Sequence, residues 1–421
     1  MLKSIRGMKD MWGEELERFR SVEKTARHWL ALSGYMEIAT PILELTELFR
    51  RSIGEATDIV EKEMYTFTDV GGDSLTLRPE ATAGVLRALA EHHILGEDQV
   101  VKLFTLGPMF RHERPQKGRL RQFHQINAEV LGSAHPWVDG ETLFLAWTIL
   151  KEIGLEGTLA INSLGCPDCR PAFRDKLFAF LDQGKGDLCA DCQRRAITNP
   201  LRLFDCKSQT CQAVLAGAPV LSEYLCPDCR EHFVEVKATL ARLAVPFEEN
   251  PRLVRGLDYY VRTTFEIQIS HLGAQNAVAG GGRYDGLVKV IGGPDIPGIG
   301  FALGVDRILV ALSDRVASVE KKTRVFITAM GDSPRLRAYT ILMDLRKAGV
   351  SADMVFEPRS LKSQMRRANR WGARLVLILG EEEEKKGEIL VRDMETSQQE
   401  SVLLDRLLEE VKKRIGKEES L

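Results

Sequence analysis

The sequence predicts an α+β fold: an antiparallel sheet core with helices, a small inserted domain and a C-terminal α/β domain. Three observations lead to this prediction. Short apolar runs bounded by turn residues occur at 100–107, 265–269 and 301–305, as expected for sheet strands. All eight cysteines fall within 166–229, which marks a segment of different composition. From residue 324 onward, strand-like and helical stretches alternate, and that alternation is typical of an α/β domain.

Composition sets the outer bounds. The chain has 421 residues, 44% of them hydrophobic and 28% charged, which is enough for two or three globular domains. Its net charge is only −2, so any nucleic-acid partner would have to meet local basic patches. The longest apolar run, at 298–312, is interrupted by Asp306 and Arg307, and the N-terminus has no apolar signal region. We therefore expect a cytoplasmic protein without a membrane partner.

The N-terminal region predicts a helix followed by a strand. Apolar residues recur at intervals of three and four, which predicts an amphipathic helix that packs on the core. These residues are Leu16, Phe19, Val22, Ala26, Trp29 and Leu30. The following stretch, 34–44, predicts a strand that ends at Pro41.

A basic hairpin is predicted at 107–125, GPMFRHERPQKGRLRQFHQ. Between Arg111 and Arg121 it contains five Arg or Lys residues and one acid, with Phe110 and Phe123 on either side. Guanidinium groups match phosphate oxygens and an aromatic face can stack on a purine, so this composition suits ATP. The alternative is a solvated basic loop between two strands.

This hairpin resembles motif 2 of the class II aminoacyl-tRNA synthetases, in the form found in the histidyl-tRNA synthetase family. Three further blocks fit the same family in the same order. LVRGLDYY at 253–260 resembles its histidine-binding signature, AGGGRYDGL at 279–287 its second signature, and GIGFALGVDRI at 298–308 the class II motif 3. The stretch at 34–44 resembles motif 1, which forms the dimer interface in that family. The resemblance therefore implies a homodimer with a class II sheet core.

The implied reaction joins L-histidine to its tRNA through an adenylate. A carboxylate attacks the α-phosphorus of ATP, so the site must position the reactants and supply positive charge, with Mg²⁺ on the leaving pyrophosphate, and no general base is needed. On this resemblance Arg255 and Arg111 are the catalytic residues. The implied ATP-binding residues are Arg111, Glu113, Arg121, Phe123 and Arg307.

The resemblance also implies a histidine pocket. Glu80 and Thr82 in TLRPEATAG, together with Gln125, are the implied ligands of the α-ammonium group, and Glu129 and Tyr260 of the imidazole ring. Singly, each of these residues has an ordinary structural explanation. The full implied histidine-binding set is Glu80, Thr82, Arg111, Gln125, Glu129, Arg255, Tyr259, Tyr260 and Tyr284.

The cysteines form three CxxC pairs and one CxxxxC pair: Cys166 and Cys169, Cys189 and Cys192, Cys206 and Cys211, Cys226 and Cys229. In a reducing compartment such pairs favour structural Zn²⁺ over disulfides, and eight ligands suffice for two tetrahedral ions. Unmetallated thiols and a redox role are the alternatives. The region corresponds to the insertion of the family, here expected at 166–245 within a catalytic core of 1–322.

The C-terminal stretch, 323–421, follows a polar linker at 318–323 and is similar in layout to the anticodon-binding domain of several class II enzymes. Lys362, Arg366 and Arg370 recur every four residues, so they form one helical stripe that suits RNA phosphates, although a solvated helix face explains them equally well. The expected tRNA-binding residues are Arg114, Gln116, Lys117, Arg366 and Arg370.

The glycine run at 280–282 and the family resemblance each allow other interpretations. Gly280–Gly282 lacks the spacing of a P-loop or a dinucleotide-binding loop, so we expect these glycines to allow close approach to a ligand, with Arg283 and Asp285 as a structural ion pair. A non-catalytic paralogue that regulates ATP phosphoribosyltransferase would share the core and the histidine pocket. A class II enzyme for proline, threonine or glycine would share the C-terminal layout, but LVRGLDYY argues against it.

Overall fold

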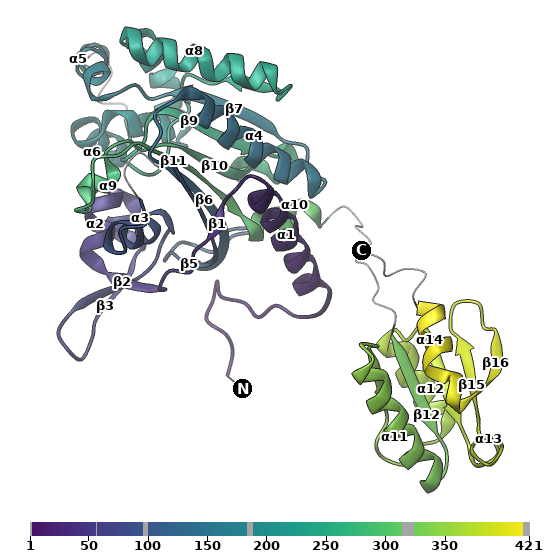
Figure 1. Cartoon of the computed structure of the whole chain (residues 1–421). Helices are drawn as coiled ribbons and strands as arrows, with labels where there is room; N and C mark the ends of the chain where they lie inside the picture. Colours follow the sequence, from purple (N-terminus) through teal and green to yellow (C-terminus); the bar gives the residue numbers. More distant parts are fainter. Residues whose placement is uncertain (1, 56, 96–99, 183–187, 314–323, 416–421) are drawn as a thin grey trace. The chain divides into compact units, whose positions relative to one another are not determined.

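The chain folds into two compact units, residues 1–317 and 318–421 (Figure 1). The computed structural model describes residues 2–55, 57–95, 100–182, 188–313 and 324–415. The expected linker at 318–323, and with it the boundary at 322, lies outside the described residues. Among the described residues, no helix is long and apolar enough to cross a membrane.

An eight-stranded sheet forms the centre of the first unit, in the order β1-β5-β6-β11-β10-β9-β7-β8. Its strands are β1 Met36–Glu37, β5 Val101–Phe110, β6 Gln122–Leu131, β7 Thr158–Ser163, β8 Phe247–Glu249, β9 Val261–Gln268, β10 Ala277–Arg283 and β11 Gly298–Gly304. The central strands pair antiparallel, as expected. The two edge pairs, β1 with β5 and β7 with β8, are parallel because long helical connections separate the paired strands.

The two faces of this sheet have different chemistry. Along β6, Ile126, Ala128 and Val130 belong to the main apolar core, whereas Gln125 and Glu129 alternate with them and point to the other face. The same alternation continues in β11, where Ile299, Phe301 and Leu303 join the core and glycines and Ala302 face the opposite side. The sequence pattern thus sends apolar residues to one face and polar or small residues to the other.

Helices cover the apolar face. They are α1 Gly13–Leu32, α4 Pro136–Glu152, α8 Pro227–Arg242 and α10 Val305–Leu312. The predicted amphipathic helix is confirmed by α1, whose Phe19, Val22, Ala26 and Leu30 are buried in this core.

Shorter elements gather around the other face. The helices are α2 Thr46–Ile53, α3 Thr82–Glu91, α5 Arg170–Leu181, α6 Ala190–Thr198, α7 Gln209–Val214 and α9 Leu287–Val290, with a π-helical turn at Ile59–Glu63. Single 3₁₀ segments lie at Pro167–Cys169, Pro200–Asp205, Leu215–Gly217 and Leu221–Tyr224, whereas the 3₁₀ segment Ser270–Gln275 packs on α10 at the apolar face. A three-stranded sheet is formed by β2 Leu43–Leu45, β4 Ser74–Leu77 and β3 Tyr65–Thr68.

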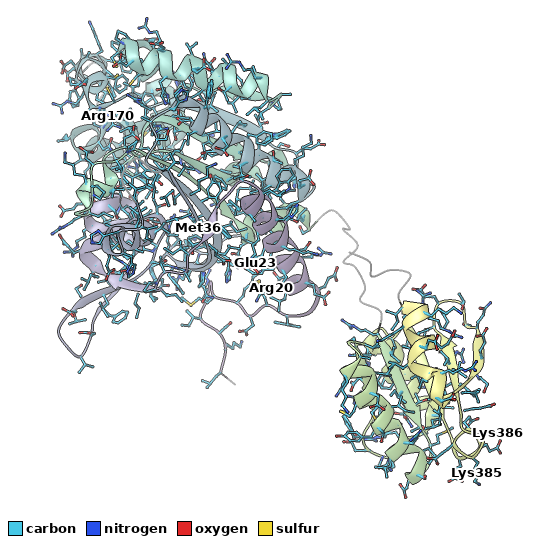
Figure 2. The ribbon with its side chains drawn as sticks, viewed as in Figure 1. Arg20, Glu23, Met36, Arg170, Lys385 and Lys386 are labelled. Atoms are coloured by element: carbon cyan, nitrogen blue, oxygen red, sulfur yellow. The ribbon has the colours of Figure 1, made fainter. Side chains whose placement is uncertain are left out.

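The strand predicted to end at Pro41 is present but shorter, since β1 ends at Glu37. The chain forms the two-residue β1, leaves the large sheet, and pairs again as β2 with β4. Pro41 lies between the two strands and has no N–H to donate, so the ladder cannot continue through it. Met36 on β1 (labelled in Figure 2) and Leu45 on β2 are more than half exposed.

The segment expected as an inserted domain, 166–245, divides between two cores. Its first part packs with α3 and α9 around Phe173, Leu177 and Leu203. Its last helix, α8, buries Phe233, Val236 and Leu240 in the main core beside α4. The chain has therefore returned to the catalytic core before residue 245.

The second unit is a five-stranded sheet, in the order β13-β12-β14-β15-β16, with helices on both faces. Its strands are β12 Val325–Ala329, β13 Ala352–Met354, β14 Leu375–Leu379, β15 Glu388–Asp393 and β16 Gln399–Leu403. Its helices are α11 Asp332–Lys347, α12 Leu361–Trp371, α13 Glu381–Lys386 and α14 Leu407–Ile415, with a 3₁₀ turn at Leu404–Arg406. The alternating part, through β14, agrees with the sequence prediction, and β15 and β16 add an antiparallel hairpin.

Candidate active site

A highly charged cleft lies on the polar face of the large sheet, with a volume of about 190 Å³. The hairpin between β5 and β6 and the strands β9, β10 and β11 form its walls. Four arginines line it: Arg111, Arg119, Arg255 and Arg307. Three acids accompany them: Glu113, Glu266 and Asp306. A cleft with this many guanidinium groups suits a polyanionic ligand.

Four of the five predicted ATP-binding residues line this cleft: Arg111, Glu113, Phe123 and Arg307. The Arg111 guanidinium lies 5.3 Å from the centre of the Phe123 ring, in cation–π contact. Arg307 donates from Nη1 to the carbonyl of Ala277 at 2.7 Å and from Nε to the carbonyl of Gly118 at 3.3 Å. Arg307 therefore connects the hairpin tip to the start of β10.

Arg121 is not among the residues that line the cleft. Its backbone N–H donates to Gly7 at 2.7 Å, and its Nε donates to the carbonyl of Glu113 at 3.2 Å. Arg119 lies in the cleft instead and forms an ion pair with the Glu113 carboxylate. Both arginines follow the turn at Gly118 and lie outside the regular strands, since β5 ends at Phe110 and β6 begins at Gln122, so spacing along the hairpin could not assign them.

Arg255 enters the cleft from the loop before β9 and forms an ion pair with Glu266 of β9. Burial alone would lower the pKa of Arg255, but Glu266 and the neighbouring tyrosines raise it above the ordinary arginine value. The guanidinium lies over Gly280, where an added Cβ would come within 2.5 Å of Nη1. The glycine therefore makes room for Arg255, whereas the sequence interpretation assigned this space to a ligand.

Next to the cleft lies a buried cluster of Glu80, Thr82, Glu129 and Tyr284. The Glu80 carboxylate accepts from the backbone N–H groups of Thr82 and Ala83, both at 2.8 Å. Thr82 Oγ1 donates to Glu129 Oε1 at 2.8 Å, and the Tyr284 hydroxyl donates to Glu129 Oε2. Burial raises the pKa of Glu129 to about 8, and burial also raises the pKa of Glu80. The hydrogen bonds fix both carboxyl groups in place.

The tyrosines form one aromatic wall. The ring of Tyr259 lies 4.6 Å from that of Tyr260 and 5.8 Å from that of Tyr284, centre to centre. Gln125 joins the cleft to this cluster, since it lines the cleft and lies on the same face of β6 as Glu129. Among the described residues, its buried Oε1 has no hydrogen-bond partner. This amide oxygen is thus an acceptor ready for a ligand donor.

The structure brings together the whole predicted histidine-binding set, although only Arg111, Gln125 and Arg255 line the cleft itself. The sequence interpretation missed Arg119, His124, Glu266 and Asp306. Asp306 is buried, accepts from the backbone N–H of His124 at 2.6 Å, and lies in the DR pair of the third motif. The motif that supplied Arg307 could therefore have pointed to its neighbour as well.

The predicted tRNA-binding residues lie at two places. Arg114, Gln116 and Lys117 are exposed at the tip of the β5–β6 hairpin, where Gln116 and Arg119 pair through their backbones. Arg366 and Arg370 are exposed on α12 of the second unit together with Lys362, whereas Ala368 on the opposite side is buried.

The eight cysteines form two groups of four. Cys166, Cys169, Cys226 and Cys229 make the first group, and Cys189, Cys192, Cys206 and Cys211 the second. Within each group, all sulfur atoms lie within 4.8 Å of one another, and all eight cysteines are free thiols. Each group is therefore able to hold a metal ion.

Comparison with known proteins identifies this arrangement. A family model described as histidyl-tRNA synthetase matches residues 7–308. The chain belongs to the histidyl-tRNA synthetase family. A second model, described as an anticodon binding domain, matches residues 324–414.

Similar proteins agree with this family over nearly the whole chain. The chain is 51% identical over 407 residues to a histidine–tRNA ligase of Desulfosudis oleivorans, with 96% of each protein covered. It is 52% identical over 412 residues to one of Desulfatibacillum aliphaticivorans, with 98% of each covered. The crystal structure of the apo histidyl-tRNA synthetase of S. aureus has a TM-score of 0.82 at 36% identity, and covers 97% of this chain and 99% of its own. The predicted family and the α+β class II synthetase fold are confirmed.

Proposed function

We propose that this member of the histidyl-tRNA synthetase family is a histidine–tRNA ligase. It activates L-histidine with ATP to histidyl-adenylate and pyrophosphate, and then transfers histidine to the 3′ end of histidine tRNA. The observation that carries this proposal is the junction of two sites on one sheet face. A cleft lined by four arginines meets a buried group of carboxyl and phenol side chains, and Gln125 lies between them.

The first site binds ATP as substrate with Mg²⁺. Phe123 holds the adenine, Arg119 and Arg307 neutralise the outer phosphates, and Arg111 and Arg255 hold the α-phosphate as its charge develops. The carboxylates fit the hard-cation chemistry of Mg²⁺, since Asp306 has a buried Oδ1 without a hydrogen-bond partner among the described residues. We keep Arg121 in a supporting role, because it fixes the hairpin base beside Gly7.

The second site binds histidine. Glu80, Thr82 and Gln125 receive the α-ammonium group, and the carboxylate points toward Arg111 and Arg255 in the cleft. Glu129 reads the imidazole ring together with the wall of Tyr259, Tyr260 and Tyr284. A pocket that hydrogen-bonds both ring nitrogens rejects apolar amino acids strongly, because its buried polar groups would be left unpaired.

The tRNA and a second copy of the chain are the implied macromolecular partners. Arg114, Gln116 and Lys117 are exposed at the hairpin tip beside the cleft, so we assign them to the acceptor end of the tRNA. Arg366 and Arg370 on α12 suit the phosphates of the anticodon arm. For the homodimer we assign the surface around β1 and β2, where Met36, Leu43 and Leu45 are exposed. Structural Zn²⁺ at the two cysteine groups completes the proposal.

Amino-acid-dependent exchange of pyrophosphate into ATP tests the activation step. The purified protein is assayed with Mg²⁺ and each of the twenty amino acids, without tRNA. We expect exchange with histidine alone. Exchange with a different amino acid would overturn the assignment of Glu129 and Tyr260, and histidine binding without exchange would favour the regulatory paralogue. The match of residues 324–414 to an anticodon binding domain favours the ligase.

A further inference from the structure

We propose that the eight cysteines form two structural Zn(Cys)₄ sites, and that these sites hold the loop 255–260 of the histidine pocket from two sides. The role assigned to the loop rests on the proposed function, whereas the two metal sites rest only on the cysteine geometry. The loop carries Arg255, Tyr259 and Tyr260, and it has no regular secondary structure of its own. Its position must therefore come from what it contacts.

The first site joins the CxxC pair Cys166 and Cys169 to the pair Cys226 and Cys229, about sixty positions later in the chain. The Sγ atom of Cys166 lies 3.6 Å from that of Cys169 and 3.9 Å from that of Cys226. Four sulfurs around a zinc ion at about 2.3 Å would be separated by roughly 3.8 Å. Disulfide bonding needs about 2.05 Å instead, so the spacing fits a metal ion and not a disulfide.

The second site joins Cys189 and Cys192 to Cys206 and Cys211. Cys189 and Cys206 have their Sγ atoms 3.9 Å apart, which is again the edge of a zinc–sulfur tetrahedron. In both groups two sulfurs belong to buried residues and two to half-buried residues, so an ion at the centre would have little contact with water. Four thiolates fill the coordination of zinc and leave no open position, which makes each site structural and not catalytic.

Local structure around both groups favours thiolates. Cys189 precedes the first residue of α6 and Cys226 precedes that of α8, so both groups include the N-terminus of a helix. The backbone N–H of Cys189 donates to Cys211 Sγ, and that of Cys226 to Cys169 Sγ, both at 3.2 Å. Each site thus repeats one arrangement: a helix start, a CxxC pair and an N–H···S bond from one pair to the other.

The first site contacts the end of the loop. Arg170 follows Cys169 directly, and its Nη2 donates to the carbonyl of Tyr260 at 2.6 Å (Arg170 is labelled in Figure 2). On the other side of the CxxC pair, Gly165 accepts from the backbone N–H of Arg262 at 2.8 Å. The chain on both sides of the first CxxC pair therefore fixes the junction between the loop and β9.

The second site contacts the middle of the loop. Asn199 and Arg202 lie between Cys192 and Cys206, in the turn that the site closes. Asn199 Nδ2 donates to Asp258 Oδ1 at 2.7 Å, and Arg202 Nη1 donates to the carbonyl of Gly256 at 3.2 Å. Arg202 is only 5% exposed. Loss of the zinc ion from the second site would loosen the segment that orients Asn199 and Arg202. The loop between Arg255 and Tyr259 would then lose these two contacts.

Metal analysis of the full-length protein, purified without chelator, tests the two sites first. Elemental analysis is expected to find two zinc ions per chain. Replacement by Co²⁺ is expected to give the absorption bands of tetrahedral thiolate coordination. Fewer than two ions per chain, or iron in place of zinc, would overturn the assignment. The zinc content does not depend on activity. If the protein held two zinc ions but catalysed no pyrophosphate exchange, the two metal sites would be supported and the proposed function would be wrong.

A pair of variants on one short helix tests the link to the loop. Cys211→Ser removes a ligand of the second site, and Thr210→Ser, at the neighbouring exposed position on α7, is its control. Cys211→Ser is expected to leave one zinc per chain and to raise the KM for histidine about tenfold or more, with a fall in pyrophosphate exchange because Arg255 lies on the same loop. The control is expected to keep two zinc ions and the wild-type KM values.

A second route to the same test avoids the risk that a variant does not fold. Chelation of the wild-type protein, followed by addition of Zn²⁺, should raise and then restore the KM for histidine. A chelated protein with wild-type KM values and no bound zinc would overturn the positioning role. Loss of the global fold on chelation, measured by circular dichroism, would do the same, since the rise in KM would then reflect a general loss of structure.

Discussion

The guanidinium of Arg255 occupies the space that a side chain at Gly280 would need, because a Cβ on Gly280 would lie 2.5 Å from Arg255 Nη1. Gly280→Ala should therefore displace Arg255 without a change of charge in the cleft. We expect pyrophosphate exchange to fall by about 100-fold, as is typical of a displacement near 1 Å at a catalytic group. Gly217→Ala is the control, since its Cβ would meet only an ordinary contact at 3.7 Å. Normal pyrophosphate exchange in Gly280→Ala would show that activity does not depend on this position of the Arg255 guanidinium.

Arg255→Ala tests the arginine directly. The substitution removes positive charge where the α-phosphate would react, so we expect adenylate formation to fall by orders of magnitude while the fold and the dimer persist. Arg252→Ala, three residues earlier on an exposed part of the same segment, should retain activity. Both are measured by pyrophosphate exchange and by sedimentation. Near-normal exchange would remove Arg255 from the mechanism.

The predicted Arg283–Asp285 ion pair is confirmed at 3.0 Å, and Asp139 of α4 joins it in the buried interior. Arg283→Leu would leave Asp139 as a buried charge without its partner. We expect a loss of about 3–5 kcal/mol in the free energy of unfolding. Lys289→Leu breaks the exposed pair with Asp295 and should leave the free energy of unfolding nearly unchanged. Chemical denaturation measures the free energy of unfolding of both variants. Equal losses in the two variants would contradict the prediction that the buried pair contributes more than the exposed one.

Glu129 should make the stability of the first unit depend on pH. Its pKa in the folded protein is about 8 against an ordinary value of 4.5, so between these values the folded protein holds a proton that the unfolded chain has released. Stability is therefore highest below pH 4.5 for this group and is lost as the pH rises through 8. Glu129→Gln should remove this decline. Melting temperatures of the wild type and the variant at pH 5.5 and 8.5 would measure this decline. Parallel pH profiles for the two proteins would refute the role of Glu129.

The basic stripe on α12 should act on tRNA and not on adenylate formation. Replacing Lys362, Arg366 and Arg370 by alanine should raise the KM for tRNA and reduce the salt dependence of charging, because fewer phosphates are neutralised. Pyrophosphate exchange should be unchanged. A control variant replaces Lys385, Lys386 and Lys412, which are also exposed in this unit (Figure 2 labels the first two). If both sets of substitutions raised the KM for tRNA equally, the stripe on α12 would act only through general surface charge.

Much of the fold followed from periodicity. The spacing of Phe19, Val22 and Ala26 predicted the buried side of α1, and apolar runs located β5, β9 and β11, because burial of one face dictates these patterns. Residues 34–44 agreed only in part, since the predicted strand ends at Glu37 and not at Pro41. Met36 and Leu43 are exposed there whereas Tyr35 is buried, and such a mixed pattern does not fix where a strand ends.

Residue spacing alone predicted less of the site than of the fold. The resemblance located the arginines, but Arg119 lines the cleft, whereas Arg121 donates from Nε to the carbonyl of Glu113 and is not among the lining residues. The grouping of the cysteines was likewise undetermined, since Cys166 pairs with a segment about sixty residues away. Glu266 gave no signal because a glutamate on a strand is usually solvated, and only its contact with Arg255 distinguishes it.

The alternation along β6 restricts how this enzyme can change. Gln125 and Glu129, which we assign to the substrate, lie on one face, while Ile126, Ala128 and Val130 fill the core from the other. Insertion or deletion of one residue in this strand would exchange the two sets, placing carboxyl and amide groups in the apolar core and aliphatic groups in the pocket. Substrate preference in this strand can therefore evolve by substitution at every second position, whereas changes of length are confined to the hairpin between β5 and β6.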